Sequence, residues 1–257
     1  MTQIDLLSSQ SPKPDFAINA EAKTSPGIFI ASLILGLWVI SITLFFLLNI
    51  YKTPIPLIAI AILWQTFLYT GLFITAHDAM HGVVFPQNPK VNNWVGRICV
   101  FLYALFSYQE LLQKHWSHHR YPATKDDPDF YDQQQQNFFA WYFNFIKSYW
   151  NWRQHLRFIL VYIFLRYICN IPEANLILFW CIPSIFSSIQ LFYFGTFLPH
   201  RRLAEGYTSL HCTRSTHLPV FWSFITCYHF GYHKEHHEYP HVPWWRLPEV
   251  YQAGKYQ

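Results

Sequence analysis

Charged residues are scarce in this chain of 257 residues, at 12% of the total, whereas hydrophobic residues make up 52%. Residues 28–50, 55–76 and 176–199 contain no Asp, Glu, Lys or Arg at all. At about 1.5 Å rise per residue, each run is long enough as a helix to cross the roughly 30 Å of hydrocarbon in a bilayer. The runs exclude a soluble enzyme and predict a multi-pass integral membrane protein.

The chain also lacks other common signals. Its five cysteines form no CxxC pair, which argues against a disulfide framework or a thiolate metal site. The net charge of only +4, without a basic run interleaved with aromatics, argues against nucleic acid as a partner. Residues 1–27 are mostly polar, unlike the short basic start of a signal peptide, so the first apolar run is expected to stay in the protein. We expect this polar N-terminal segment to precede a single membrane domain at 28–257.

The apolar runs predict an all-α fold with about four transmembrane helices in two hairpins. The hairpins are expected at residues 28–50 with 55–76 and at residues 158–171 with 176–199. We interpret residues 94–112, which carry Arg97 and Glu110, as an interfacial or re-entrant helix, because a crossing there would put later histidines on the wrong face. In this arrangement 16 of the 18 Lys and Arg residues lie on one side, which is typical of the cytoplasmic face.

Most of the fourteen histidines lie in three clusters, HDAMH at 77–81, HWSHH at 115–119 and HKEHH at 233–237. Their i, i+4 and i, i+3, i+4 spacings place the side chains on one face of a helix. Neutral imidazole is the commonest metal ligand among side chains. One such pair arises by chance fairly often, but three clusters in one chain predict a metal-binding cap on the cytoplasmic face.

The clusters hold eight histidines, and His200 adds a ninth at the end of the last apolar run. One tetrahedral zinc ion takes only four ligands, so we expect two metals with four or five imidazoles each. The expected ligands are His77, His81, His115, His118, His119, His200, His233, His236 and His237. Nitrogen ligands suit iron, zinc, copper or nickel, and the residues alone leave the metal open.

Other polar residues lie close to these clusters in the sequence. We expect some of the neighbouring carboxylates to accept N–H hydrogen bonds from ligand imidazoles and to fix their tautomers. These carboxylates are Asp78, Asp126, Asp127, Asp129, Glu235 and Glu238. We interpret His229, four residues before His233, as a neighbour of the ligands and not as a ligand itself.

The three clusters resemble the histidine boxes of the membrane fatty-acid desaturase and hydroxylase superfamily. Within it, residues 64–88, 190–202 (QLFYFGTFLPHRR) and 221–249 are similar to bacterial and cyanobacterial β-carotene ketolases. The resemblance implies a di-iron monooxygenase that takes β-carotene from the lipid. It would form echinenone and then canthaxanthin by two dioxygen-dependent hydroxylations of a ring methylene and a dehydration. Electrons would come from a soluble, ferredoxin-like donor.

The resemblance implies the eight box histidines as iron ligands, whereas His200 matches only the broader superfamily. Acyl-CoA desaturases have an asparagine four residues before that histidine, and it holds a metal-bound water. This chain has Thr196 there. We expect Thr196 to lie beside the ligands, and the departure from asparagine leaves the water contact open.

Two kinds of alternative function remain open from the residues alone, a related enzyme of the same superfamily and a protein that is not an enzyme. A carotenoid ring hydroxylase or an acyl-lipid desaturase would use the same boxes. A histidine-rich membrane metal carrier would need ligands along a path through the membrane, because transporters bind their cargo near the midplane.

Overall fold

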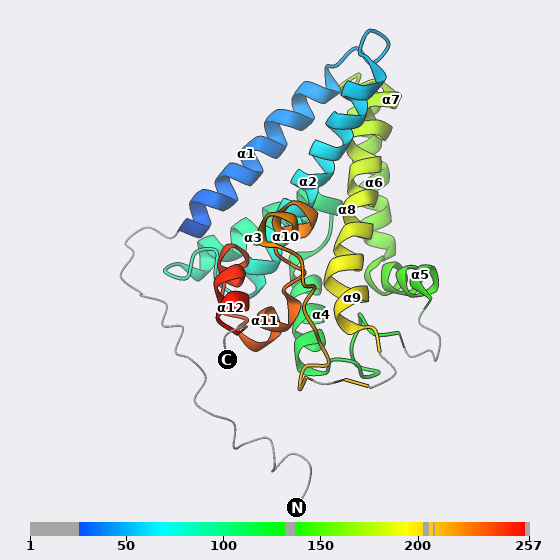
Figure 1. The fold of residues 1–257 in the computed structure, drawn as a ribbon. Helices are drawn as coiled ribbons and strands as arrows, with labels where there is room; N and C mark the ends of the chain where they lie inside the picture. Colours follow the sequence, from blue (N-terminus) through cyan, green and yellow to red (C-terminus); the bar gives the residue numbers. More distant parts are fainter. Residues whose placement is uncertain (1–25, 132–136, 203–205, 208, 255–257) are drawn as a thin grey trace, which may run out of the picture.

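The protein is described here by a computed structural model, which covers residues 26–131, 137–202, 206–207 and 209–254. Within these residues all regular secondary structure is helical (Figure 1). The expected polar segment 1–27 lies almost entirely outside the described residues.

The helices follow one another through the chain, with longer connections only at 121–137 and 201–219. In order they are α1 (Pro26–Phe46), α2 (Ile55–Met80), α3 (Pro89–Ala104), α4 (Tyr108–Arg120), α5 (Phe138–Tyr149), α6 (Trp152–Ile163), η1 (Phe164–Ile168), α7 (Glu173–Leu176), η2 (Ile177–Cys181), α8 (Ile182–Leu191), η3 (Phe192–Phe197), α9 (Leu198–His200), α10 (Val220–Cys227), α11 (His233–Glu238), η4 (Trp244–Arg246) and α12 (Leu247–Gly254). The elements η1 to η3 are π-helical turns and η4 is a 3₁₀ turn.

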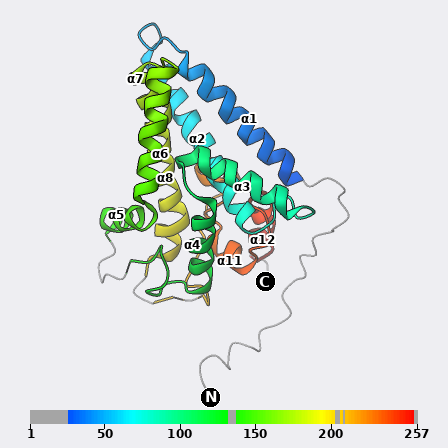
Figure 2. The same cartoon turned by 180° about the vertical axis from the view of Figure 1, so that it is seen from behind.

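Three helices among the described residues are long and apolar enough to cross a membrane. They are α1, α2 and the continuous helix from α7 to α9, which spans Glu173–His200 over 28 residues. Figures 1 and 2 show α1 and α2 as one hairpin, and α6 with α8 as a second one whose turn lies at the same end. The predicted all-α membrane fold is therefore confirmed.

The first leg of the second hairpin is shorter than the other long helices. The apolar segment expected at 158–171 belongs to α6, with 12 residues, and to η1, with five. It is not among the three long helices. A different part of the chain, the pair α3 and α4, is the candidate for a fourth span.

Segment 94–112 is not a single helix, because the chain bends by 97° between α3 and α4. Leu105 ends α3 in the left-handed region with φ 56°. The Ser107 side chain then accepts a hydrogen bond from the Glu110 amide and starts α4. The bend sends α4 toward the end of the molecule where α2 finishes (Figure 2).

Polar side chains join the two hairpins at both the turns and the middle. The Asn175 amide group donates to the carbonyls of Phe45 and Leu48 at 2.7 and 2.8 Å, and so ties the second turn to the end of α1. Deeper in the bundle, the Thr70 hydroxyl of α2 lies 2.7 Å from Gln190 Oε1 and 2.9 Å from Ser187 Oγ. In lipid the hydrophobic effect does not drive helices together, so hydrogen bonds of this kind act with close packing to hold them.

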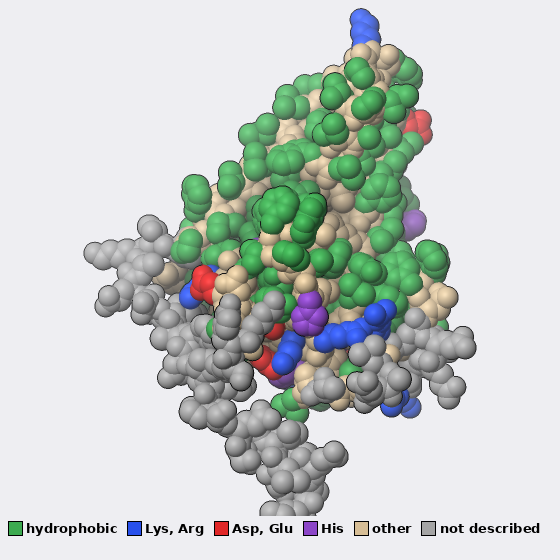
Figure 3. Space-filling view, viewed as in Figure 1, with side chains coloured by type: hydrophobic (Ala, Val, Ile, Leu, Met, Phe, Trp, Pro, Cys, Tyr) green, Lys and Arg blue, Asp and Glu red, His purple; other side chains and the backbone are tan. Residues whose placement is uncertain are grey.

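The surface divides into an apolar part and a charged part. Figure 3 shows apolar side chains covering the long helices, whereas most charged side chains and histidines gather at the other end, below α10. This distribution fits a bundle whose upper part lies in lipid and whose histidine-bearing end lies at or beyond the interface.

The hairpin arrangement predicts that the turn near Tyr51 and the loop near Lys125 lie on opposite sides of the membrane. Both side chains are exposed, Tyr51 by 93%. In a background without the native cysteines, Tyr51→Cys should react with an impermeant thiol reagent from one side only, and Lys125→Cys from the other side only. Labelling of both positions from the same side would contradict this topology.

Candidate metal centre

Nine histidines from four separate helical elements meet at one end of the bundle. His77 and His81 come from the end of α2, His115, His118 and His119 from α4, His200 from α9, and His233, His236 and His237 from α11. These are the nine histidines that the sequence singles out, and the structure brings all of them together.

The nine imidazoles form two groups, in each of which the potential ligand atoms lie within 4.8 Å of one another. The first group contains His77, His81, His115, His119 and His236, and the second contains His118, His200, His233 and His237. We refer to them as the five-histidine group and the four-histidine group.

The helical spacing explains how the clusters divide between the groups. Histidines four residues apart point to the same group, as His115 and His119 do on α4. The histidine at i+3, His118, points to the other group. On α11 the same rule places His233 and His237 together and sends His236 to the five-histidine group. Helices α4 and α11 therefore each supply both groups.

Within the groups, Nε2 atoms face one another at short distances. The Nε2 atoms of His81 and His115 lie 2.6 Å apart, and those of His119 and His236 lie 3.0 Å apart. In the four-histidine group the Nε2 atoms of His233 and His237 lie 3.1 Å apart. Two nitrogens bound to one metal at about 2.1 Å are separated by roughly 3 Å. The arrangement thus suits ligands that converge on a common ion.

Hydrogen bonds at Nδ1 fix the ring orientations of His118 and His200. The Nδ1 atom of His118 lies 2.9 Å from Asp127 Oδ1, and that of His200 lies 3.2 Å from the carbonyl oxygen of Cys212. With Nδ1–H donating in each case, Nε2 carries the free lone pair. Both Nε2 atoms are buried and have no hydrogen-bond partner among the described residues. Buried nitrogens with free lone pairs are what a metal ion would satisfy.

Burial keeps most of the imidazoles neutral. Loss of hydration lowers the pKa of His81 to about 3. Burial, reinforced by neighbouring histidines, also places the pKa values of His115, His233 and His236 well below the usual value. His118 differs, since burial lowers its pKa but the carboxylates of Asp129 and Asp127 outweigh that effect and raise it. The neutral form is the one that binds a metal.

Three of the six expected carboxylates contact histidines of the two groups. Besides its contact with His118, Asp127 accepts from the amides of Ala123 and Asp129, both at 2.9 Å. Asp129 Oδ2 lies 3.8 Å from His118 Nδ1. Asp78 Oδ1 lies 3.5 Å from His77 Nδ1, and its Oδ2 accepts from the Trp244 amide at 3.0 Å.

The other expected neighbours have different partners. Asp126 is exposed, Glu235 accepts from the Ser215 hydroxyl, and Glu238 pairs with Lys234 at 3.9 Å. His229 is buried and its ring stacks on Tyr232, outside both groups. Thr196 is buried one turn before His200 and lines the cavity described below.

Some residues of the site could not be found by inspecting the clusters. Tyr149, at the end of α5, donates its hydroxyl to Asp129, and the Cys212 carbonyl accepts from His200. The His211 ring lies 5.8 Å from that of His237, although His211 has no histidine partner at helical spacing. These contacts join segments that are far apart in sequence, so no local pattern indicates them.

A cavity of about 420 Å³ ends at the histidines. Its walls come mainly from α2, α4, α5, α6 and α8, and most of its lining is apolar and aromatic. The aromatic residues are Phe73, Tyr103, Phe106, Tyr142, Phe143, Phe145, Tyr149, Trp150, Phe158 and Phe230. Four histidines also line it: His77 and His115 of the five-histidine group, and His118 and His233 of the four-histidine group. A ligand in this cavity would thus reach both groups.

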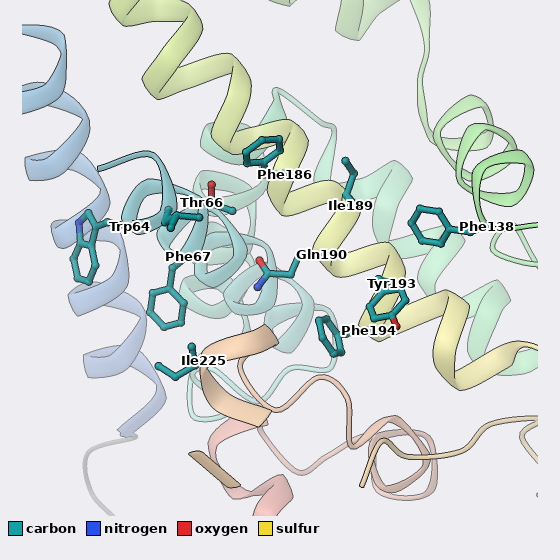
Figure 4. A pocket seen from close by; sticks show the side chains of 11 residues that line it. Trp64, Thr66, Phe67, Phe138, Phe186, Ile189, Gln190, Tyr193, Phe194 and Ile225 are labelled. Atoms are coloured by element: carbon teal, nitrogen blue, oxygen red, sulfur yellow. The ribbon is translucent and has the colours of Figure 1, made fainter. Parts of the chain in front are cut away.

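A second groove, of about 820 Å³, lies on the other side of α8. In Figure 4, Trp64 and Phe67 of α2 line one side of it, and Phe186 and Ile189 of α8 line the other. None of the nine histidines lines this groove. It therefore has no direct part in chemistry at the two groups.

Comparison with known proteins gives consistent matches. The family model for fatty acid desaturase matches residues 52–168 and 148–255. A β-carotene ketolase of Paracoccus sp. (strain PC1) is 43% identical over 202 residues, which cover 77% of this chain and 81% of that protein. A β-carotene ketolase of Paracoccus sp. (strain N81106) is 45% identical with the same coverage. A zeaxanthin 4-ketolase of Chlamydomonas reinhardtii is 36% identical over 95% of this chain and 55% of its own length.

The two groups predict two separable metal sites. We expect about two metal ions per purified chain, falling to about one in His81→Ala or His237→Ala and to near zero in the double variant, because each substitution removes a ligand from a different group. Elemental analysis by mass spectrometry measures this directly. His217→Ala is the matched control, since His217 is exposed and its Nδ1 bonds to the Tyr251 hydroxyl at 3.0 Å. Unchanged metal content in both single variants would refute the assignment.

Asp127 should matter more than its neighbour Asp126. Asp127→Ala removes the acceptor that orients His118, so metal affinity in the four-histidine group should fall about 10- to 100-fold. Competition with a chelator of known affinity measures the change. Asp126→Ala is the control and should behave as the unmodified chain does, because Asp126 is exposed. Equal effects of the two substitutions would mean that Asp127 does not act through His118.

Proposed function

The chain belongs to the fatty acid desaturase family and, within it, to the β-carotene ketolases, and on this basis we propose that it is a membrane oxidoreductase that converts the ring methylene of β-carotene into a ketone. The observation that carries the proposal is the aromatic cavity that ends at histidines of both groups. A rigid, apolar polyene fits such a lining, and the oxidisable end of the molecule would lie against the histidines.

The donor set fits a pair of iron ions. All nine potential ligands are imidazole nitrogens, which suit iron, and the buried Nε2 atoms of His118 and His200 lack any protein partner among the described residues. We propose that one iron is held by the five-histidine group and the other by the four-histidine group. When bound, the iron pair supplies the dioxygen-dependent oxidation of an unactivated C–H bond, which protein side chains cannot perform.

The residues of the chain then have three tasks. The histidines hold the metals, and the carboxylates of Asp127 and Asp78 fix imidazole orientation. The aromatic walls hold the ring end of the carotenoid, exclude water from the histidine end and keep one methylene nearest the metals. Positioning of this kind contributes much of the rate in enzymes whose chemistry comes from a cofactor.

We further propose that the substrate enters from the lipid and that electrons arrive from the opposite direction. Phe143 and Ile185 line the cavity and are 69% and 52% exposed on α5 and α8, so the opening faces the side of the bundle. The histidine end carries most of the charged surface, which we assign to the cytoplasmic face. A soluble, ferredoxin-like protein would deliver electrons there.

Histidines gathered at one end also distinguish the chain from a metal carrier, whose ligands would follow a path across the membrane.

Pigment analysis of a bacterium that accumulates β-carotene tests the proposal. Expression of the chain should convert β-carotene to echinenone and then canthaxanthin, and only when dioxygen is supplied. The reason is that two hydroxylations of one methylene give a geminal diol, which loses water to leave the ketone. Pigments with only ring-hydroxylated carotenoids would indicate a hydroxylase, and unchanged carotene with newly unsaturated lipids would indicate a desaturase. Either result would refute the ketolase activity.

A further inference from the structure

The cavity that ends at the histidines contains one carboxylate among the described residues that line it, that of Asp129. Most of the other lining groups are aromatic or aliphatic. A carboxylate facing an apolar cavity is costly unless it is hydrogen-bonded or used to bind a polar group. Its position is also informative, since Asp129 Oδ2 lies 3.8 Å from Nδ1 of His118. The carboxylate is thus at the end of the cavity where oxidation would occur.

The two oxygens of Asp129 have different surroundings. Oδ1 accepts the hydroxyl of Tyr149, another residue of the cavity wall. The backbone is held as well, because the Asp129 amide donates to Asp127 at 2.9 Å and its carbonyl accepts from the Trp141 indole at 2.7 Å. Oδ2 lies 3.8 Å from the His118 ring nitrogen, which itself lies 2.9 Å from Asp127. The positive charge of Lys114 also acts on the Asp129 carboxylate, but its ammonium donates to the Ser148 carbonyl. Because Asp129 lines the cavity and its Oδ1 is taken by Tyr149, Oδ2 is the oxygen that remains to accept a hydrogen bond from a molecule there.

We propose that Asp129, held by Tyr149, accepts a hydrogen bond from the hydroxyl group that the first oxidation places on the substrate ring, and so retains this alcohol for the second oxidation. The inference rests on the proposed ketolase function and deepens it. β-Carotene itself is a hydrocarbon and has no group that Asp129 could bind. The alcohol has one, so the carboxylate distinguishes the intermediate from the starting substrate.

The overall chemistry explains why retention matters. In the first step a ring CH₂, one O₂, two electrons and two protons give CHOH and water. The second step takes the same carbon to C(OH)₂ with another O₂, two electrons and two protons, and again releases water. Loss of one more water leaves C=O. The electrons come from the soluble electron-carrier protein of the proposed function. An alcohol that left between the steps would end as a hydroxylated product and not as a ketone.

The size of the effect follows from hydrogen-bond energetics. A hydrogen bond to a charged group is stronger than one between neutral groups, so losing its geometry has a measurable effect. A loss of about 1.4 kcal/mol corresponds to a tenfold change in retention. Weakening the Asp129 contact should therefore raise the released alcohol about tenfold relative to ketone.

Tyr149→Phe is the main test. It removes the hydroxyl that donates to Asp129 and holds the carboxylate in place, and it leaves an aromatic ring in the wall. In carotene-accumulating cells expressing this variant the readout is the ratio of products and not the total rate, because Tyr149 also belongs to the aromatic wall of the cavity. The ratio of 4-hydroxylated to 4-keto carotenoid should rise about tenfold. With purified protein, KM for supplied 4-hydroxy-β-carotene should rise more than KM for β-carotene, and the iron content should stay unchanged. Asp129→Asn should shift the ratio in the same direction, with iron content measured because Asp129 also faces His118.

Tyr142→Phe is the matched control, since Tyr142 lies in the same cavity but its hydroxyl is 2.6 Å from Ser188 Oγ. It should keep the unmodified product ratio. The inference is overturned if Tyr149→Phe slows both steps equally and leaves the ratio unchanged, or if Tyr142→Phe shifts the ratio as much. If the unmodified chain oxidises no carotene, the proposed function itself fails, and the inference fails with it.

Discussion

The gathering of nine imidazoles at one point, six of them buried and three partly buried, is the constraint on which the rest of the structure depends. Removing an imidazole from water without a partner for its nitrogens is unfavourable, and several of these nitrogens have none among the described residues. Metal ions would remove that penalty for a whole group at once. The two hairpins supply the platform, since α2 and α9 both end at this point, and the bend after α3 brings α4 down beside them (Figure 2). Helix α11 closes the arrangement from the C-terminal side.

Backbone strain among the described residues is concentrated around this centre. Six non-glycine residues have positive φ, and five of them lie in segments that position a histidine or its partner. These five are Leu105 before α4, Ala123 beside Asp127, Cys212 opposite His200, and Tyr228 with His229 before α11. Each such conformation costs about 1–2 kcal/mol for a residue with a side chain. The packing around the centre must offset that cost.

Local spacing made part of this centre predictable. The i, i+3, i+4 clusters identified the histidines that meet, and charge-free runs identified the three long helices, because both signals lie within a few turns of one helix. Contacts between distant segments carry no such signal. DDPD at 126–129 could not show that Asp126 faces solvent while Asp129 faces a cavity. The end of α3 at Leu105 could not be predicted for the same reason. Composition alone indicates one continuous helix through this apolar stretch.

Helices α4 and α11 each contribute histidines to both groups, which restricts how the groups can move relative to each other. On each helix, histidines at i and i+4 serve one group and the histidine at i+3 serves the other. A rotation of α4 that moved His118 would also move His115 and His119, so neither group can change shape alone. Helix geometry, with about 1.5 Å rise per residue, thereby sets the spacing between the two sites. Since the cavity touches His115 and His118 together, a substrate ring placed against this wall meets both groups in a fixed relation. A rigid centre of this kind suits repeated oxidation of one carbon, because the protein need not rearrange between the two steps.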